Sequence, residues 1–234
     1  MGGFEGRRVI VTGGAGALGR AVVAALAERG AVCHVPCRTE AEAAELAARS
    51  HPRIVASVAG DLADEAAVER FFGGVADLWA SIHLAGGFAF GPFAQMRKTD
   101  LMRQVEMNLV TAALCCRAAV AAMQQHGQGG RIVNVAARPA IEWRTGAGMA
   151  AYAASKAAVA ALTVALAEEV AKDGILVNAV APSIMDTPAN RAAMPDAEHA
   201  NWPKVEEVAA TILFLASPDN RVTRGAVAPV FGRS

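Results

Sequence analysis

The stretch VTGGAGALGR, residues 11–20, joins a short β-rich run, RRVIVT at 7–12, to a segment with helical spacing at 16–30. It contains the pattern Gly14-x-Gly16-x-x-Gly19, in which small residues let the backbone approach a pyrophosphate that rests on a helix N-terminus. Glycine-rich turns also serve as plain connectors, so the position of this loop matters as much as its spacing. Its place in the first strand–helix unit predicts a dinucleotide-binding loop formed by Gly13, Gly14, Gly16, Ala17, Leu18 and Gly19.

Strand and helix signals alternate along the chain. Strands are expected at 7–12, 31–36, 53–60, 80–87, 131–136, 175–181 and 226–231, and helices at 16–30, 39–50, 64–72, 99–123, 149–172 and 205–216. The second helix is predicted to open with a capping box, Thr39-Glu40-Ala41-Glu42. Strand followed by helix, repeated, requires right-handed crossovers and gives a parallel sheet covered on both faces. The prediction is an α/β fold: a single doubly wound (Rossmann) domain over 1–234 with about seven strands.

The composition excludes several classes of protein. Hydrophobic residues make up 54% of the 234 residues, enough to bury a large core in one domain. Lys+Arg 22 balance Asp+Glu 22, so binding to nucleic acid is not expected. We see no apolar run approaching the roughly 18 residues of a membrane span, and we expect a cytoplasmic protein with no membrane partner. The four cysteines and five histidines lack zinc-ligand spacing, so no metal site is predicted.

Further motifs follow the strands in a definite order. The glycine loop is followed by Asp61-Leu62, Ala85-Gly86-Gly87, Asn108, Tyr152-x-x-x-Lys156 and Asn178-Ala-Val-Ala-Pro182. In this order the motifs resemble those of the short-chain dehydrogenase/reductase family over nearly the whole chain. Two departures are Ala17, where the family usually has its middle glycine, and Ser183, where a glycine is common.

The resemblance implies a nicotinamide cofactor, a small-molecule substrate and a homodimer or homotetramer built through the long helices. It also implies that Asp61 binds the adenine edge, that Leu62 lies beneath the ring, and that Thr187 holds the nicotinamide carboxamide or the diphosphate. Ala85, Gly86, Gly87 and Pro182 complete the expected cofactor contacts, together with Lys156.

Cofactor choice is expected to depend on the end of the second strand, CHVPCRTE at 33–40. A carboxylate there accepts the ribose 2′-hydroxyl of NAD and repels a 2′-phosphate, whereas an arginine accommodates the 2′-phosphate of NADP. This chain has the uncharged Cys37 followed by Arg38. We therefore favour NADP(H), with NAD(H) as the alternative if Arg38 is only a solvated residue at a helix start.

Tyr152 and Lys156 are four residues apart, one turn of a helix, so their side chains share a face. A tyrosine phenol has a pKa near 10, so proton exchange near neutral pH requires a cation beside it. By resemblance, Tyr152 and Lys156 are catalytic, Lys156 also binds the nicotinamide ribose, and Asn108 anchors a water for proton relay. The structural alternative makes Tyr152 an ordinary helix aromatic and Lys156 a solvated residue.

The serine that this family places before the tyrosine is missing. Its position falls on Ala137 when counted from Asn134, or on Pro139 when counted back from Tyr152, and neither has a hydroxyl. Losing one oxyanion donor typically costs about 10²–10³ in rate. The dihydropteridine reductases, a branch of the family, likewise lack the serine, and 185–202 resembles them locally. This favours a quinonoid, pterin-like or other planar substrate.

Two alternatives remain open at this stage. Thr145 is the candidate for replacing the serine hydroxyl in an ordinary carbonyl reductase, and a catalytically silent cofactor-binding protein is the other alternative. The segment 183–203 is long for a connection, so we expect it to cover the substrate. Aromatic residues in the loops expected to meet there are Phe88, Phe90, Phe93, Trp143 and Trp202.

Overall fold

The computed structural model of the chain describes residues 3–48 and 51–234. Seven parallel strands form one sheet in the order β3-β2-β1-β4-β5-β6-β7. They are β1 Arg8–Thr12, β2 Val32–Cys37, β3 Ile54–Val58, β4 Leu78–His83, β5 Gly130–Val135, β6 Ile175–Pro182 and β7 Val227–Val230. The order reverses between β1 and β4, so the loops after these two strands open into the crevice where such sheets bind ligands.

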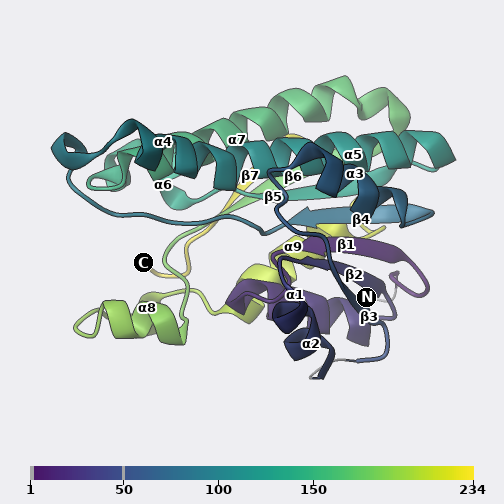
Figure 1. Cartoon of the computed structure of the whole chain (residues 1–234), viewed down its shortest axis with the longest axis horizontal. Helices are drawn as coiled ribbons and strands as arrows, with labels where there is room; N and C mark the ends of the chain where they lie inside the picture. The colour runs from purple at the N-terminus through teal and green to yellow at the C-terminus, as the bar shows by residue number, and fades with distance from the viewer. Residues whose placement is uncertain (1–2, 49–50) are drawn as a thin grey trace.

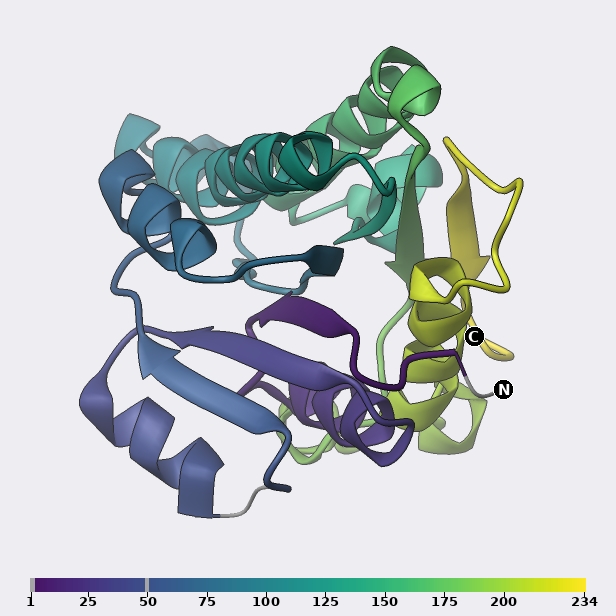
Figure 2. The ribbon, with the colours of Figure 1, turned by 90° about the vertical axis from the view of Figure 1, so that its right-hand side faces the viewer.

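Helices cover both faces of the sheet (Figures 1 and 2). One layer consists of α1 Ala17–Glu28, α2 Glu40–Ala48 and α9 Val205–Ala216, and the other of α3 Glu65–Gly73, α4 Lys98–Gln104, α5 Thr111–His126 and α7 Ala150–Glu169. Shorter helices lie in the connections, at α6 Arg138–Ile141 and α8 Pro188–Ala193. The predicted doubly wound fold is confirmed.

Alternation along the strands divides the core into two halves. In β1, Val9 and Val11 pack in the cluster under α1, α2 and α9, whereas Ile10 packs in the cluster under α3, α5 and α7. Successive strand side chains point to opposite faces, so a strand covered on both sides must be apolar throughout. This is why RVIVT contains no alternating polar residue after Arg8 until Thr12.

The helix from α4 to α5 is continuous but contains a π-helical turn, η2 Val105–Val110. This turn holds Asn108, whose side chain is buried. A π-turn inserts one extra residue into the helix and turns a side chain away from its regular position, and such turns are frequent at functional sites. The sequence predicts the helix but not this interruption.

Two helical stretches of the described chain, Lys98–His126 and Ala150–Glu169, are long and apolar enough to span a bilayer by length and composition alone. Our expectation that no segment would approach this length was therefore wrong. Both stretches lie along the sheet in the upper layer of Figure 1, and 33% of each apolar window is buried inside the structure.

Several predicted boundaries need correction. The fourth strand ends at His83 rather than Gly87, because residues 84–87 turn toward Asn108. The second helix is described only to Ala48, so its predicted end at Ser50 lies outside the described residues. The short helices within 137–149 and 183–203 were not predicted, because runs of three to six residues carry no readable periodicity.

Candidate active site

The glycine loop is shaped by two close approaches. Gly13 has φ +67°, and a Cβ there would lie 2.7 Å from the backbone nitrogen of Ala85 in the loop after β4. A Cβ on Gly19 would collide with the carbonyl oxygen of Gly13. Gly16 is the N-cap of α1 and offers no side-chain oxygen to the first-turn N–H groups. These donors are left for an external anion, so the loop fits a cofactor pyrophosphate.

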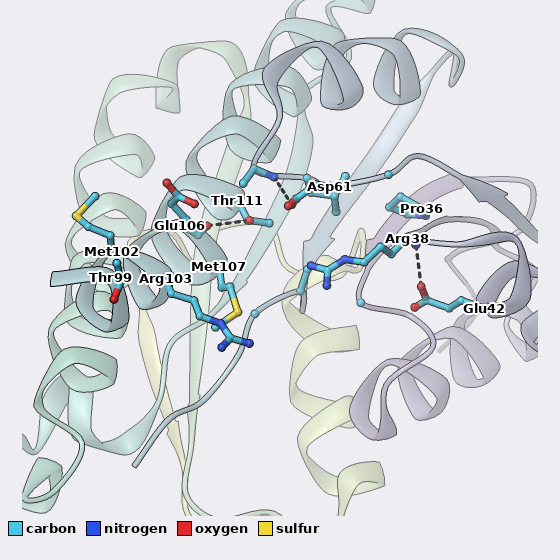
Figure 3. Close-up of a pocket in the computed structure, with 16 residues that line it drawn as sticks. Pro36, Arg38, Glu42, Asp61, Thr99, Met102, Arg103, Glu106, Met107 and Thr111 are labelled. Carbon is cyan, nitrogen blue, oxygen red and sulfur yellow. Dashed lines mark hydrogen bonds between the residues drawn. The ribbon is translucent and has the colours of Figure 1, made fainter. Parts of the chain in front are cut away.

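A cavity of about 650 Å³ opens beside this loop at the reversal of strand order. It is lined by Gly13, Pro36, Arg38, Glu42, Gly60, Asp61, Leu62, Ala63, Ala85, Gly86, Thr99, Met102, Arg103, Glu106, Met107 and Thr111. The wall therefore includes six of the predicted cofactor residues, and Figure 3 shows its polar members. Predicted cofactor residues outside this cavity wall are Gly14, Gly16, Ala17, Leu18, Gly19, Gly87, Lys156, Pro182 and Thr187.

The end of β2 carries no carboxylate. Cys37 is fully buried and Arg38 is exposed at the cavity, where its backbone N–H donates to Glu42 Oε2 at 2.7 Å and its guanidinium has no hydrogen bond among the described residues. The predicted capping box is thus only half formed: Thr39 Oγ1 accepts from the Glu42 N–H at 3.2 Å, but the Glu42 carboxylate binds Arg38 instead of Thr39. Across the cavity, Asp61 Oδ1 accepts from the Ala63 N–H at 3.0 Å.

The predicted catalytic residues come together next to Gly86. A Cβ on Gly86 would lie 2.5 Å from Asn108 Oδ1 and 3.4 Å from Lys156 Nζ. Lys156 is 7% exposed, and its ammonium donates to the carbonyl oxygen of Val135 at 2.8 Å. The residues Asn108, Lys156 and Tyr152 thus belong to η2 and α7, which pack together beside the cavity.

Asn108 joins three parts of the chain. Its Oδ1 accepts from the Gly87 N–H at 3.0 Å, while its Nδ2 donates to the Gly87 carbonyl at 3.0 Å and to Ser155 Oγ at 3.1 Å. Ser155 in turn donates to the carbonyl oxygen of Tyr152 at 2.8 Å. The amide therefore fixes the loop after β4 against the turn of α7 that carries Tyr152.

Burial governs the titration of the Tyr–Lys pair in this structure. It raises the pKa of Tyr152 to about 12 and lowers the pKa of Lys156 to about 8. The sequence led us to expect that Lys156 would lower the pKa of Tyr152, and that direction is wrong here because burial dominates. The phenol therefore carries its proton at neutral pH, which is the form that a proton donor requires.

The serine position is apolar in the folded chain as well. Ala137 is 4% exposed and forms the N-cap of α6 without a side-chain hydrogen bond. Thr145, the candidate replacement, is exposed and its hydroxyl donates to the Glu142 carbonyl at 2.8 Å. Its position in this structure gives no support to Thr145 as an oxyanion donor.

Aromatic side chains gather around Tyr152. The Phe88 ring contacts the Tyr152 ring edge-on, with centroids 5.0 Å apart and an interplanar angle of 83°. Phe90 packs on Gly148, where a Cβ would lie 2.5 Å from the Phe90 ring, and the Gly91 N–H donates to the Gly148 carbonyl at 2.8 Å. Phe88, Phe90, Phe93 and Trp143 are exposed, whereas Trp202 is buried and stacks with His199.

The segment 183–203 is ordered by its own contacts. It contains α8, whose N-cap Thr187 accepts from the Asn190 N–H at 3.2 Å, and an ion pair between Asp186 and Arg191. Ser183 Oγ donates to the Phe231 carbonyl, which ties the segment to the chain beyond β7. Thr187 is 8% exposed, and its hydroxyl caps the helix.

Three features near the site were missed at the level of sequence. Ser155 lies inside the Tyr–Lys motif but was not singled out, although its spacing of three from Tyr152 could have placed it on the same helix face. His83 is buried between Ser81 and Asn134, with hydrogen bonds of 2.8 Å to each. Arg103 lines the cavity from α4, and only the fold brings it there.

Metal ligands are not gathered anywhere in the described part of the chain, which holds no group of three or more His, Cys, Asp or Glu side chains suited to an ion. The arrangement described above needs none, because its parts are an anion-binding loop, a phenol, an ammonium and an amide.

Comparison with known proteins identifies the relatives of this chain. The model of the short chain dehydrogenase family matches residues 7–198. Galactitol 2-dehydrogenase of Rhizobium johnstonii is 36% identical, with 97% of this chain and 94% of that protein covered. L-xylulose reductase of Bos taurus is 32% identical, with 98% and 96% covered. The structure of a short-chain type dehydrogenase/reductase from Mycobacterium ulcerans superposes with a TM-score of 0.89 at 26% identity, covering 98% of this chain and 90% of that one.

The family match spans more than half of the chain, and the relatives are similar over almost their whole length. The chain belongs to the short-chain dehydrogenase/reductase family and is an NAD(P)-dependent oxidoreductase.

Proposed function

We propose that this protein is an NADPH-dependent reductase in which Tyr152 donates the proton. The observation that carries the proposal is the cluster at Gly86, where the buried Lys156 ammonium and the Asn108 amide lie beside the cofactor cavity. Lys156 is one turn along α7 from Tyr152, and Asn108 binds Ser155 of the same turn. When bound, the reduced nicotinamide supplies the hydride. The chain's own residues then have to orient the substrate, supply one proton and keep the cofactor in place.

Tyr152 is suited to be the general acid. With the pKa of its phenol raised by burial, the group is protonated at neutral pH and can transfer that proton to the substrate oxygen or nitrogen as the neighbouring carbon accepts hydride. Lys156 is charged below pH 8 and stabilises the phenolate that remains. The Asn108 side chain is engaged with Gly87 and Ser155, so in this proposal it positions the two elements rather than carrying a proton itself.

Arg38 supports the preference for NADPH. Its guanidinium lines the cavity without a side-chain partner among the described residues, and the end of β2 offers no carboxylate to the ribose hydroxyls. A 2′-phosphate would pair with this cation, whereas NADH has no group for it. In a matched pair of titrations, Arg38→Ala should lower the affinity for NADPH more than the affinity for NADH. An unchanged ratio of the two affinities would contradict the assignment.

The substrate that we propose is planar and at least partly aromatic, a quinonoid pterin-like compound being one example. The Phe88 ring stands edge-on to Tyr152, the exposed Phe90 packs on Gly148 just before α7, and Trp143 is exposed in the connection from β5 to α7. Aromatic walls bind flat rings well. A conjugated C=N acceptor also depends less on the hydroxyl donor that Ala137 cannot provide.

A second candidate is a sugar-alcohol or ketose substrate, because the relatives reported above act, by their names, on galactitol and L-xylulose. The two candidates are separated by measuring NADPH and NADH oxidation with a quinonoid dihydropterin, a ketose and a simple ketone. Turnover of the pterin alone supports the first, and turnover of the ketose at a higher kcat/KM supports the second. Tight binding of NADPH without any turnover would favour a silent cofactor-binding protein.

Two further properties are proposed rather than shown. The segment 183–203 covers the substrate, and the chain forms a homodimer or homotetramer through the helices that include α5 and α7. Exposed small residues on α7, Ala154, Ala161 and Ala165, support close packing of a second copy.

A further inference from the structure

Arg103 enters the cofactor cavity from the wall opposite Arg38. Arg38 directly follows β2, and Arg103 lies on α4, which lines the cavity together with Glu106 and Met107 of η2. Figure 3 shows both side chains extended into the space between these elements, with both guanidinium groups toward the middle.

Neither guanidinium forms a hydrogen bond or an ion pair in the described part of the chain, although, besides the hydrogen bonds from Arg97, the charge of Arg103 contributes to lowering the pKa of the Asp100 carboxyl. Eight other described arginines do form ion pairs with nearby carboxylates: Arg8, Arg20, Arg53, Arg97, Arg117, Arg138, Arg191 and Arg224. Two like charges on facing walls of one cavity repel each other unless an anion lies between them. The donors of both guanidinium groups are therefore available to the oxygens of a bound anion.

The carboxylates of the same cavity do not fill that role. Glu42 accepts the backbone N–H of Arg38, and Asp61 accepts the backbone N–H of Ala63. Glu106 is an exposed residue of η2, and no hydrogen bond joins its carboxylate to Arg38 or Arg103 in the described chain. In Figure 3 none of these three side chains lies between the two guanidinium groups.

We propose that Arg103 is a second determinant of cofactor choice, which holds the 2′-phosphate of NADPH together with Arg38 from the opposite side. This rests on the proposed function, namely that the cavity beside the glycine loop takes NADPH. A phosphate carries enough oxygen acceptors to receive both guanidinium groups at once, and arginine pairs with phosphate in a bidentate manner. A ribose 2′-hydroxyl has no charge and cannot bridge them.

The alternative contact for Arg103 is the diphosphate, which NADH and NADPH share. The experiment therefore measures dissociation constants by calorimetry, in the absence of substrate, for NADPH, NADH, 2′,5′-ADP and 5′-ADP with the full chain and with Arg103→Met and Arg103→Lys. Arg103→Met should weaken NADPH and 2′,5′-ADP by about tenfold, the loss of one charge-assisted hydrogen bond, and leave NADH and 5′-ADP within about twofold. Arg103→Lys should recover part of the loss, because the charge is kept but the fork of donors is not.

Arg70→Met is the matched control. Arg70 is an exposed arginine on α3 that does not line the cavity, so its removal changes the net charge equally without touching the site. If Arg103→Met lowers the affinities for NADH and NADPH equally, Arg103 contacts the diphosphate and the inference is overturned. An unchanged affinity for both dinucleotides would overturn it as well. If the unsubstituted chain binds neither dinucleotide, the proposed function itself fails. Loss of NADPH selectivity in Arg38→Ala but not in Arg103→Met would overturn only the role of Arg103.

Discussion

At the scale of single residues, the site combines a phenol that keeps its proton with a buried cation that holds its charge only below about pH 8. Both shifts have the same cause, the removal of water by α7 and the loops around it. The phenol is therefore in the protonated form that a general acid requires at neutral pH.

Tyr152→Phe should reduce turnover by at least about a thousandfold, because the only proton donor proposed at the site is removed while the ring and its contact with Phe88 remain. The affinity for NADPH should stay within about twofold. Stopped-flow turnover and fluorescence titration of NADPH on the same preparation check both parts. Wild-type turnover in this variant would remove Tyr152 from the mechanism.

Thr145→Val should leave kcat/KM unchanged within about twofold, since the hydroxyl is bound to the Glu142 carbonyl. If the Thr145 hydroxyl were the oxyanion donor, its removal would lower the rate by a factor of about 10²–10³. Steady-state kinetics, with the candidate substrate that the turnover assay selects, distinguishes the two results. A loss of that size would restore Thr145 as the substitute for the missing serine.

At the scale of elements, the π-turn η2 places one amide where a regular helix would not. From that position Asn108 binds both backbone groups of Gly87 and the Ser155 hydroxyl. Its side chain therefore connects the loop after β4, the helix from α4 to α5, and α7 by hydrogen bonds.

Asn108→Ala should lower the free energy of unfolding by about 2–3 kcal/mol, because it leaves the part-buried N–H and carbonyl of Gly87 without their partner and removes the donor to the buried Ser155 hydroxyl. Urea denaturation at pH 7.5 measures this directly. Gln124→Ala is the control: Gln124 is an exposed residue on α5 whose hydrogen bond is to Asp173, and its loss should change stability by less than about 0.5 kcal/mol. A similar small effect for Asn108→Ala would show that the three elements are held together by packing alone.

At the scale of the whole molecule, a buried polar chain crosses the core from β4 to α7. It runs from Ser81 through His83 and Asn134 to Thr163, and Cys116 contacts both His83 and Asn134 at 3.5 Å. Burial lowers the pKa of His83 to about 4, with the hydrogen bond to Asn134 acting in the opposite direction.

This histidine makes stability depend on pH. Above pH 6.5 it is neutral in both states, but as pH falls toward 4 the unfolded chain takes up a proton that the folded chain excludes. The free energy of unfolding should therefore fall by about 2 kcal/mol between pH 7.5 and pH 5 from this group alone. Urea denaturation of the chain and of His83→Asn at both pH values tests this. An equal loss in the variant would assign the acid sensitivity to other groups.

The proposed oligomer is also a property of the whole molecule. Ala161 is exposed near the middle of α7, and Ala161→Arg places a long charged side chain where a second copy would pack. Light scattering at micromolar concentration should show a dimer or tetramer for the chain and smaller species for the variant. A monomeric unsubstituted chain would refute the interface.

The sequence by itself determined the order of seven strands and their helices, the glycine loop, the Tyr152–Lys156 pair and the absence of a serine at Ala137. These features depend on local residue spacing, on the order of motifs, or on the identity of a single residue, and all three can be read directly from the sequence. The expectation that no segment is long and apolar enough to span a membrane was wrong for two helices. Each contains isolated polar residues that interrupt an apolar run, but the mean hydropathy over an 18-residue window is still high.

Only the tertiary structure decided which groups share one environment. It brought Arg103 of α4 opposite Arg38 of β2, joined Asn108 to Gly87 and Ser155, and buried His83 with Asn134. It also reversed the expected pKa shift of Tyr152, because desolvation depends on everything packed around the phenol and not on the lysine four residues away. Contacts between distant segments and the exclusion of water arise from packing, so no local pattern in the sequence records them.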